Sequence, residues 1–380
     1  MFCTVICAAD MLAKFQLAQL PGVISYSPVH VPPMHASAPS AAPTHIAKRD
    51  LYDARFQLIA AGADAGDDGA DCDLQYVEAP SDLVPGVYEG GLKTWECSVD
   101  LAACVRDTLG SRLQSADRLR TLELGCGTAV PSLMLLRTLF AQPPRADRHI
   151  EMHLQDYNEL VFRLVTLPNL ILAWFTSPAS ASFVASFTPA PTEQDAEPEP
   201  LPPADATQPG DLALVPALLA AFKESLAAYG ITLRLFAGAW EAFPAALTAT
   251  RYDVVLTSET IYRTASLAPL TDLLWRACTA SADQRVQELE TSTAHLTLRA
   301  TNNDNVSPEA QEGSLPKEGP PVCLVAAKLV YFGVGGGVAE FTRAVENGEP
   351  SHCTRGKGSV ETIWKREDGV KRVVLQVTWQ

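Results

Sequence analysis

The sequence predicts an α/β fold in which a mostly parallel sheet carries helices on both faces and ends in an antiparallel hairpin. Three observations lead to this prediction. Short apolar strand-like runs alternate with helix-like segments from residue 120 onward, a pattern typical of parallel sheets. A glycine-rich turn, Gly125 to Gly127, stands between the first of these strands and its helix. Two β-rich runs near the C-terminus flank Asp368 and Gly369, a dipeptide that favours a hairpin turn.

The expected elements follow one another in a regular order. Strands are expected at residues 120–124, 149–155, 231–236, 252–257 and 322–328, and the hairpin at 360–365 and 371–379. Helices are expected at residues 131–140, from 157 to about 167, and at 217–229, 266–278 and 336–347. An antiparallel hairpin at the end of such a sheet is typical of a seven-strand methyltransferase fold and unusual for a dinucleotide dehydrogenase.

Three stretches lack this regular pattern. Residues 1–70 cluster Pro, His, Ala and Ser and then Gly and Asp, and we expect a mostly disordered N-terminal extension. Residues 177–211 hold eight prolines and six acidic residues and no basic one. Residues 279–321 are polar and rich in turn formers. We interpret 177–211 and 279–321 as disordered insertions within one domain, residues 71–380, because such segments bury too little apolar surface to offset the entropy of ordering.

Composition limits the classes of partner. Apolar residues make up 47% of the 380 residues, enough for a full core, and the net charge is −15. Direct binding of nucleic acid or of an anionic membrane needs a basic face, so we expect neither, and a basic partner is favoured. The nine cysteines form no C-x-x-C pair, which argues against a metal site and favours a reducing compartment. We expect neither a secretory signal nor a transmembrane helix.

The motif Leu122 to Val130 (LELGCGTAV) follows a strand and opens a helix. Gly125 and Gly127 allow close approach of a ligand to the backbone. A dinucleotide fingerprint requires a glycine where Val130 stands, so that motif fails. An acidic residue, one further residue and then G-x-G after a strand is instead the pattern of S-adenosylmethionine sites. The alternative is a glycine-rich turn that binds no ligand.

Polar or aromatic residues follow the other strands, whose carboxyl ends face the ligand crevice in such sheets. Asp156 after the second strand is a candidate for the ribose hydroxyls, or an N-cap of the next helix. Trp240 after the third strand is a candidate for covering the adenine, or a core residue. Glu259 after the fourth strand would sit where a methyl acceptor enters, or would cap a helix. Trp95 and Glu96 are a candidate lid, or a structural loop.

Several segments of the chain together resemble one family. They are PGVYEGGLKTWECSVDL (residues 85–101), LELGCGTAV, QDYN (155–158), TLPN (166–169), YDVVLTSETIY (252–262) and AAKLVYFGVGGGV (326–338). These segments look like those of the protein-histidine N-methyltransferases, a branch of the seven-strand methyltransferase-like enzymes. The resemblance covers residues 83–379 apart from the insertions, and it implies a Rossmann-like class I methyltransferase sheet.

The resemblance also implies a cofactor, a reaction and a site. Members transfer a methyl group from S-adenosylmethionine to a histidine ring nitrogen, here expected to be the tele nitrogen, of a large-subunit ribosomal protein, which implies a protein of cytoplasm and nucleus. The implied cofactor contacts are Thr94, Trp95, Glu96, Cys97, Ser98, Gly125, Gly127, Asp156, Tyr157, Asn158, Gly238, Ala239, Trp240 and Ser258. Ala129 and Ala239 depart from the family pattern, which often has glycine and an acidic residue at these positions.

The chemistry of a histidine acceptor suits these residues. Neutral imidazole is already a nucleophile, since its unperturbed pKa is about 6.5. It needs to be held in line with the methyl group, and a carboxylate that accepts from its other ring N–H would fix the tautomer. Glu259 is our candidate for this catalytic role. A protein-lysine methyltransferase of the same group and a noncatalytic cofactor-binding subunit remain open as alternatives.

Overall fold

The computed structural model describes residues 4–7, 20–34, 44–55, 57, 90–187, 201–279, 319–331, 335–347 and 356–379. Its main feature is an eight-stranded sheet of order β1-β7-β5-β4-β8-β9-β11-β10. The strands are β1 (Thr4–Cys7), β4 (Arg118–Leu124), β5 (His149–Asp156), β7 (Ile231–Ala237), β8 (Val254–Ser258), β9 (Val322–Lys328), β10 (Gly358–Arg366) and β11 (Arg372–Trp379).

The pairing confirms the predicted α/β fold with its terminal hairpin. Strands β4, β5, β7, β8 and β9 are parallel to one another, while β11 lies antiparallel between β9 and β10. Numbered along the chain from β4, this order is 3-2-1-4-5-7-6, that of the class I methyltransferase sheet. The eighth strand, β1, was not predicted; it adds to β7 in the antiparallel sense at the sheet edge.

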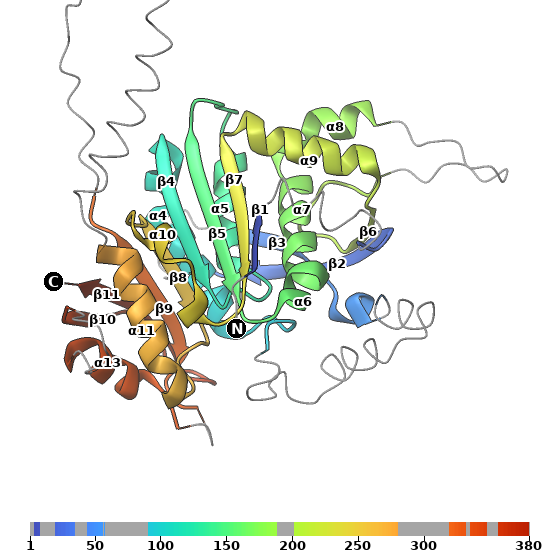
Figure 1. Cartoon of the computed structure of the whole chain (residues 1–380). Helices are drawn as coiled ribbons and strands as arrows, with labels where there is room; N and C mark the ends of the chain where they lie inside the picture. The colour runs from blue at the N-terminus through green and yellow to red at the C-terminus, as the bar shows by residue number, and fades with distance from the viewer. Residues whose placement is uncertain are drawn as a thin grey trace, which may run out of the picture.

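Helices cover both faces of this sheet (Figure 1). One face packs against α4 (Glu96–Ser115), α5 (Val130–Phe140), α7 (Leu167–Phe175) and α9 (Pro216–Ala228). The other face packs against α11 (Thr264–Thr279) and α13 (Val338–Asn347), with the short η4 (Trp240–Ala242) and α10 (Ala245–Thr248) nearby. Two apolar cores result, one on each side of the strands, as expected when a parallel sheet is buried on both faces.

The helix after β5 is longer than the sequence predicted. It starts as α6 (Glu159–Val161), passes through a π-helical turn (Phe162–Thr166) and continues as α7. Pro168 directly follows the π-helical turn, in which the Leu167 N–H donates to the carbonyl oxygen of Phe162. The proline removes one backbone donor in the interior of the helix, but the helix continues to Phe175. Every residue of α7 is buried, because a further layer of the structure covers its outer side.

That further layer is a three-stranded antiparallel sheet of order β3-β2-β6. It contains β2 (Val23–Val31), β3 (Thr44–Arg49) and β6 (Gly210–Ala213). The expectation of a mostly disordered extension over residues 1–70 is therefore wrong for β1, β2 and β3, and the domain begins before residue 71. The apolar side chains of Ile24, Tyr26, Val31 and Ile46 are buried in the core that α7 shares.

Pro28 explains why the sequence did not predict strand β2 of this sheet. Proline is rare in central strands because it cannot donate to the hydrogen-bond ladder. Here β6 pairs with β2 only from Val23 to Tyr26, so Pro28 has a single neighbouring strand, β3, opposite Ala47.

The expected disorder of residues 177–211 is also wrong for most of the described part. Residues 178–180 form a 3-10 turn, α8 (Ala181–Ser186) follows, and β6 begins at Gly210. Ser180 and Ala206 are buried within this stretch, and Leu212 is buried directly after it, so both ends of the stretch pack on the core. Residues 188–200, like residues 280–318 of the second predicted insertion, lie outside the described residues.

Among the described helices, none is by itself long and apolar enough to cross a membrane. One pair, Glu159–Phe175 with Pro178–Ser186, meets that test of length and composition together, with a bend of 76° between its parts.

Candidate active site

A cavity of about 260 Å³ opens at the carboxyl ends of β4, β5, β7 and β8. This is the end of a parallel sheet at which ligands bind in open α/β folds. Most of the residues predicted for the site line it. They are Trp95, Ser98, Gly125, Gly127, Asp156, Tyr157, Gly238, Ala239, Trp240, Ser258 and Glu259.

The remaining predicted residues lie just behind this lining. Thr94 donates its hydroxyl hydrogen bond to Thr128 Oγ1 at 3.0 Å, and Thr128 lines the cavity. Asn158 donates from Nδ2 to the carbonyl oxygen of Gly90 at 2.9 Å, which holds the segment before α4 close to β5. Cys97 is fully buried, and Glu96 points toward Lys328. These four residues support the cavity rather than line it.

The glycine-rich turn after β4 needs its glycines. Gly125 and Gly127 have φ values of +61° and +51°, a conformation that L side chains rarely adopt. A Cβ on Gly125 would lie 2.7 Å from Thr260 Cγ2, and one on Gly127 would lie 3.0 Å from the carbonyl oxygen of Gly91. A side chain at either position would therefore collide with neighbouring protein atoms, and because both glycines line the cavity, the cavity has bare backbone at this turn.

Ala129 keeps the same backbone conformation without being glycine. Its φ is +59°, and it is the fully buried N-cap residue of α5. Holding an L residue in the left-handed region costs about 1–2 kcal/mol. The departure from the family glycine therefore leaves the turn intact at this cost, and Ala129 is not among the residues that line the cavity.

Asp156 ends β5 and is 5% exposed. Oδ2 accepts the backbone N–H of Gly127 at 2.9 Å, and Oδ1 accepts that of Asn158 at 3.1 Å. The same carboxylate thus fixes the glycine-rich turn and the chain that leads into α6. Asp156 is not the N-cap of that helix, because Asn158 holds the N-cap position. Asp156 lines the cavity, where a ligand can reach it.

Gln155 is a site residue that the sequence reasoning missed. Its Oε1 accepts the indole N–H of Trp240 at 2.8 Å and the backbone N–H of Gly125 at 3.2 Å. Its Nε2 donates to the carbonyl oxygen of Gly238 at 2.6 Å. One amide therefore ties the turns after β4 and β7 together and sets the indole plane at one end of the cavity. The only signal was its place in the QDYN segment.

A second missed group joins the site to the N-terminal sheet. Asn169, in α7, accepts the backbone N–H of Arg49 at 2.8 Å and donates to the carbonyl oxygen of Thr128 at 3.0 Å. Thr166 donates to the carbonyl oxygen of Gly127 at 2.7 Å. Two side chains of the TLPN segment therefore hold the glycine-rich turn by hydrogen bonds, and Asn169 also connects this turn to Arg49 at the end of β3.

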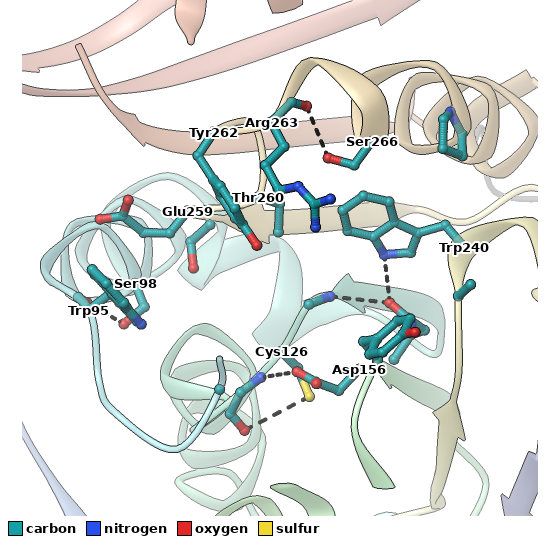
Figure 2. Close-up of a pocket in the computed structure, with 18 of the residues that line it drawn as sticks. Trp95, Ser98, Cys126, Asp156, Trp240, Glu259, Thr260, Tyr262, Arg263 and Ser266 are labelled. Carbon is teal, nitrogen blue, oxygen red and sulfur yellow. Dashed lines mark hydrogen bonds between the residues drawn. The ribbon is translucent and has the colours of Figure 1, made fainter. Parts of the chain in front are cut away.

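Glu259 follows β8 at the opposite end of the cavity from Trp240 (Figure 2). Its φ of +57° is strained for a non-glycine residue, and such strain gathers at functional sites. Oε2 accepts the hydroxyl hydrogen of Tyr331 at 2.8 Å. Oε1 is buried and has no hydrogen-bond partner among the described residues, although the ammonium of Lys328 lies 3.4 Å away.

Trp95 completes this end. The Lys328 ammonium lies 4.5 Å from the centre of its ring and 3.5 Å from Glu96 Oε2. Burial and the charge of Glu259 raise the pKa of both Cys97 and Tyr331, so these two groups stay protonated beside the carboxylate. The end of the cavity near Glu259 therefore combines an aromatic wall with one paired carboxylate.

The cavity fits S-adenosylmethionine as a cofactor. It supplies a bare-backbone cradle, a carboxylate at the end of the second parallel strand and an indole held by Gln155. Within the described ranges, no group of three or more His, Cys, Asp or Glu side chains is arranged to hold a metal ion.

The chain is similar in sequence to curated methyltransferases. It is 28% identical to histidine protein methyltransferase 1 of Saccharomyces cerevisiae, over 86% of this chain and 75% of that protein. Identity to histidine protein methyltransferase 1 of Schizosaccharomyces pombe is 29%, over 84% and 77%. The Bos taurus homolog of histidine protein methyltransferase 1 is 27% identical, over 79% and 58%. The chain is a homologue of these methyltransferases. S-adenosylmethionine is accordingly the cofactor of its cavity. No family model matches the chain.

Solved structures similar to this methyltransferase share less with it. The rRNA methyltransferase aviRa from Streptomyces viridochromogenes has a TM-score of 0.31 and 16% identity, over 79% of this chain and 92% of that one. The O-methyltransferase TomG from Streptomyces achromogenes, solved in complex with SAM, has a TM-score of 0.26 and 11% identity, over 76% and 92%.

Proposed function

We propose that the chain is a protein-histidine N-methyltransferase that acts on the tele nitrogen of a histidine in a large-subunit ribosomal protein. The observation that carries the proposal is the cavity at the carboxyl ends of β4, β5, β7 and β8, which the predicted cofactor motifs line. The names of the sequence relatives support a histidine acceptor. The net charge of −15 favours encounter with a basic protein, such as a ribosomal one.

The proposed roles divide between two ends of the cavity. Trp240, fixed by Gln155, covers the adenine, and Asp156 holds the ribose. Gly125 and Gly127 admit the rest of the cofactor against the backbone. Glu259 faces the acceptor, and its Oε1 accepts the ring N–H that the attacking nitrogen does not use. This contact fixes the tautomer and stabilises the positive charge that develops on the ring.

The reaction then needs no strong base. S-adenosylmethionine supplies a methyl group on a sulfonium, whose sulfur keeps the electron pair of the broken S–C bond. The lone pair of the neutral imidazole nitrogen forms the new N–C bond. The product ring carries one positive charge until the proton on its other nitrogen, held by Glu259, is lost to water. The chain's task is therefore orientation and exclusion of water.

We also propose that the protein works in the cytoplasm and nucleus, where ribosomal proteins are made and assembled. Cys97, Cys104, Cys126, Cys278 and Cys323 are free thiols, which suits a reducing compartment. Microscopy of a fluorescent fusion in cells tests this, and confinement to a secretory organelle would contradict it.

Mass spectrometry tests the reaction itself. The protein is incubated with methyl-labelled S-adenosylmethionine and purified large-subunit ribosomal proteins, and the label is mapped. We expect one labelled histidine, alkylated at the tele nitrogen. Label on lysine, or none on any protein while the cofactor binds, would contradict the proposal. The second result would favour a noncatalytic cofactor-binding subunit.

A further inference from the structure

Lys328 stands at the acceptor end of the cavity without lining it. It is the last residue of β9, beside the end of β8, and its side chain is 17% exposed. Its ammonium lies 3.4 Å from Glu259 Oε1, 3.5 Å from Glu96 Oε2 and 4.5 Å from the ring centre of Trp95. The carboxylates of Glu259 and Glu96 and the ring of Trp95 therefore hold the Lys328 ammonium at the acceptor end of the cavity.

Glu259 is the more buried of its two carboxylate partners. The Glu259 side chain is 8% exposed and that of Glu96 is 54% exposed. Water screens the charge of Glu96, whereas the charge of Glu259 is balanced within the protein. Tyr331 adds a hydroxyl donor to Glu259 Oε2 and is neutral. The buried pair of Glu259 with Lys328 thus carries almost no net charge, and Glu259 Oε1 makes no hydrogen bond within the described residues.

Two groups on α4 near this pair are neutral or paired. On α4, Cys97 faces Glu259 as a neutral thiol, because burial and that carboxylate raise its pKa. One turn further, Asp100 forms an ion pair with Arg372 of β11. Lys328 is therefore the cation closest to Glu259 among the described residues, and its removal would leave a buried carboxylate unbalanced.

We propose that Lys328 is a specificity-determining positioning residue, which makes the acceptor end select an uncharged imidazole over a lysine ammonium by pairing with Glu259. This inference rests on the proposed function of the same cavity. A lysine side chain arrives as a cation and must lose a proton before it can attack. The Lys328 charge repels that ammonium, and Glu259 offers it no unpaired carboxylate. A neutral imidazole carries no charge for Lys328 to repel, and its ring N–H can be accepted by Glu259 Oε1, which makes no hydrogen bond within the described residues.

The same charge affects the protonation of a bound histidine. A nearby cation disfavours imidazolium, so it lowers the pKa of the acceptor ring and keeps the ring nucleophilic at mildly acidic pH. The acidic side of the pH profile for methyl transfer reports this pKa in the bound complex. Removing the cation must therefore move that side of the profile to higher pH.

The test compares the wild type with Lys328→Met, Lys328→Arg and a control, Lys365→Met. Lys365 lies on β10 and pairs with Glu367, so this control loses the same charge outside the cavity. Single-turnover methyl transfer to purified large-subunit ribosomal proteins is followed across pH. Methylhistidine and methyllysine are then counted after acid hydrolysis.

For Lys328→Met we expect the acidic side of the profile to move up by about one pH unit, with methyllysine appearing. Lys328→Arg and Lys365→Met should keep the wild-type profile and product. Glu259→Gln removes the opposite charge, so its profile must move to lower pH, which supplies an independent test if Lys328→Met does not fold.

The outcomes separate the two proposals. If the wild type makes no methylhistidine, the proposed function fails, and the inference fails with it. If the wild type makes methylhistidine but Lys328→Met, shown by calorimetry to bind S-adenosylhomocysteine, keeps the wild-type profile and makes no methyllysine, only the inference is overturned. A shift of Glu259→Gln to higher pH would also overturn it.

Discussion

The indole N–H of Trp240 donates to Gln155 Oε1 at 2.8 Å, and this bond joins the end of β5 to the turn that follows β7. Gln155 at the same time binds Gly125 and Gly238, so one side chain holds the turns after β4 and β7 in place around the cavity. An amide can do this because it offers donors and an acceptor at once. The position of the indole therefore depends on a residue that bears no charge.

Gln155→Leu should weaken cofactor binding. The change leaves the indole N–H of Trp240 and the backbone groups of Gly125 and Gly238 without their partner, at about 1–3 kcal/mol for each buried group that finds no other. We expect a loss of affinity for S-adenosylhomocysteine of about tenfold or more, measured by calorimetry. Gln114→Leu, at an exposed position near the end of α4, is the control. Equal affinities for the two variants would show that Gln155 does not position the indole.

Glu259→Gln should separate methyl transfer from cofactor binding. A charge-assisted hydrogen bond made mainly in the transition state is worth about 2–4 kcal/mol, so the rate should fall about 30- to 1000-fold at nearly unchanged cofactor affinity. Asp156→Ala is the comparison, and there the affinity itself should fall, since ribose contacts exist in the ground state too. Turnover of Glu259→Gln near the wild-type rate would remove Glu259 from the mechanism.

Leu212→Ala should destabilise the whole domain, although Leu212 lies next to a stretch that the sequence marks as disordered. Leu212 is fully buried on β6, and truncating a buried leucine costs about 2–5 kcal/mol. Denaturant unfolding measures the free energy change. Val23→Ala on the neighbouring strand is the control, because Val23 is 51% exposed and should lose no more than about 0.5 kcal/mol. A similar small loss for Leu212→Ala would mean that β6 does not pack on the core.

His153→Gln should flatten the dependence of stability on pH. His153 is buried in β5 against the hydroxyl of Tyr252, and this burial lowers its pKa to about 3. Between about pH 3 and 6.5 the unfolded chain binds a proton that the folded chain does not, so stability rises with pH across that window and falls as pH is lowered. From about pH 6.5 to 4.5 the wild type should lose about 2 kcal/mol more than the variant.

Denaturant titrations at the two pH values measure this difference. His149→Gln, at an exposed position at the start of the same strand, should lose stability with pH as the wild type does. If His153→Gln and His149→Gln have the same pH dependence, His153 does not carry the effect.

The sequence predicted the central sheet and most of the cavity because these depend on local signals. The glycines at 125 and 127 have to be glycine, and each functional motif directly follows a strand, so the topology of a parallel sheet brings the motifs together. A strand end and a turn can be recognised within a few residues. The predicted terminal hairpin is confirmed for the same reason.

What the sequence did not predict depends on contacts between distant segments. Glu259 contacts Tyr331 and Lys328 only because β8 and β9 are neighbours in the sheet. No sequence pattern predicts the ion pair between Glu259 and Lys328. Strand β2 carries a proline, and β6 is a short strand in a proline-rich, acidic stretch. Neither segment has a local pattern that predicts a strand. Both become strands because they pair with each other in the folded protein.

The pairing of β2 with β6 fixes an order of events during synthesis. Val23 pairs with Ala213, so the N-terminal strand leaves the ribosome long before its partner exists. Until then the apolar side chains of β2 and the outer side of α7 have no complete cover, and closing such a long loop is slow. A nascent chain stalled before residue 210 would therefore hold exposed apolar surface and depend on chaperones. A chain begun after β2 would make β6 without a strand to receive it.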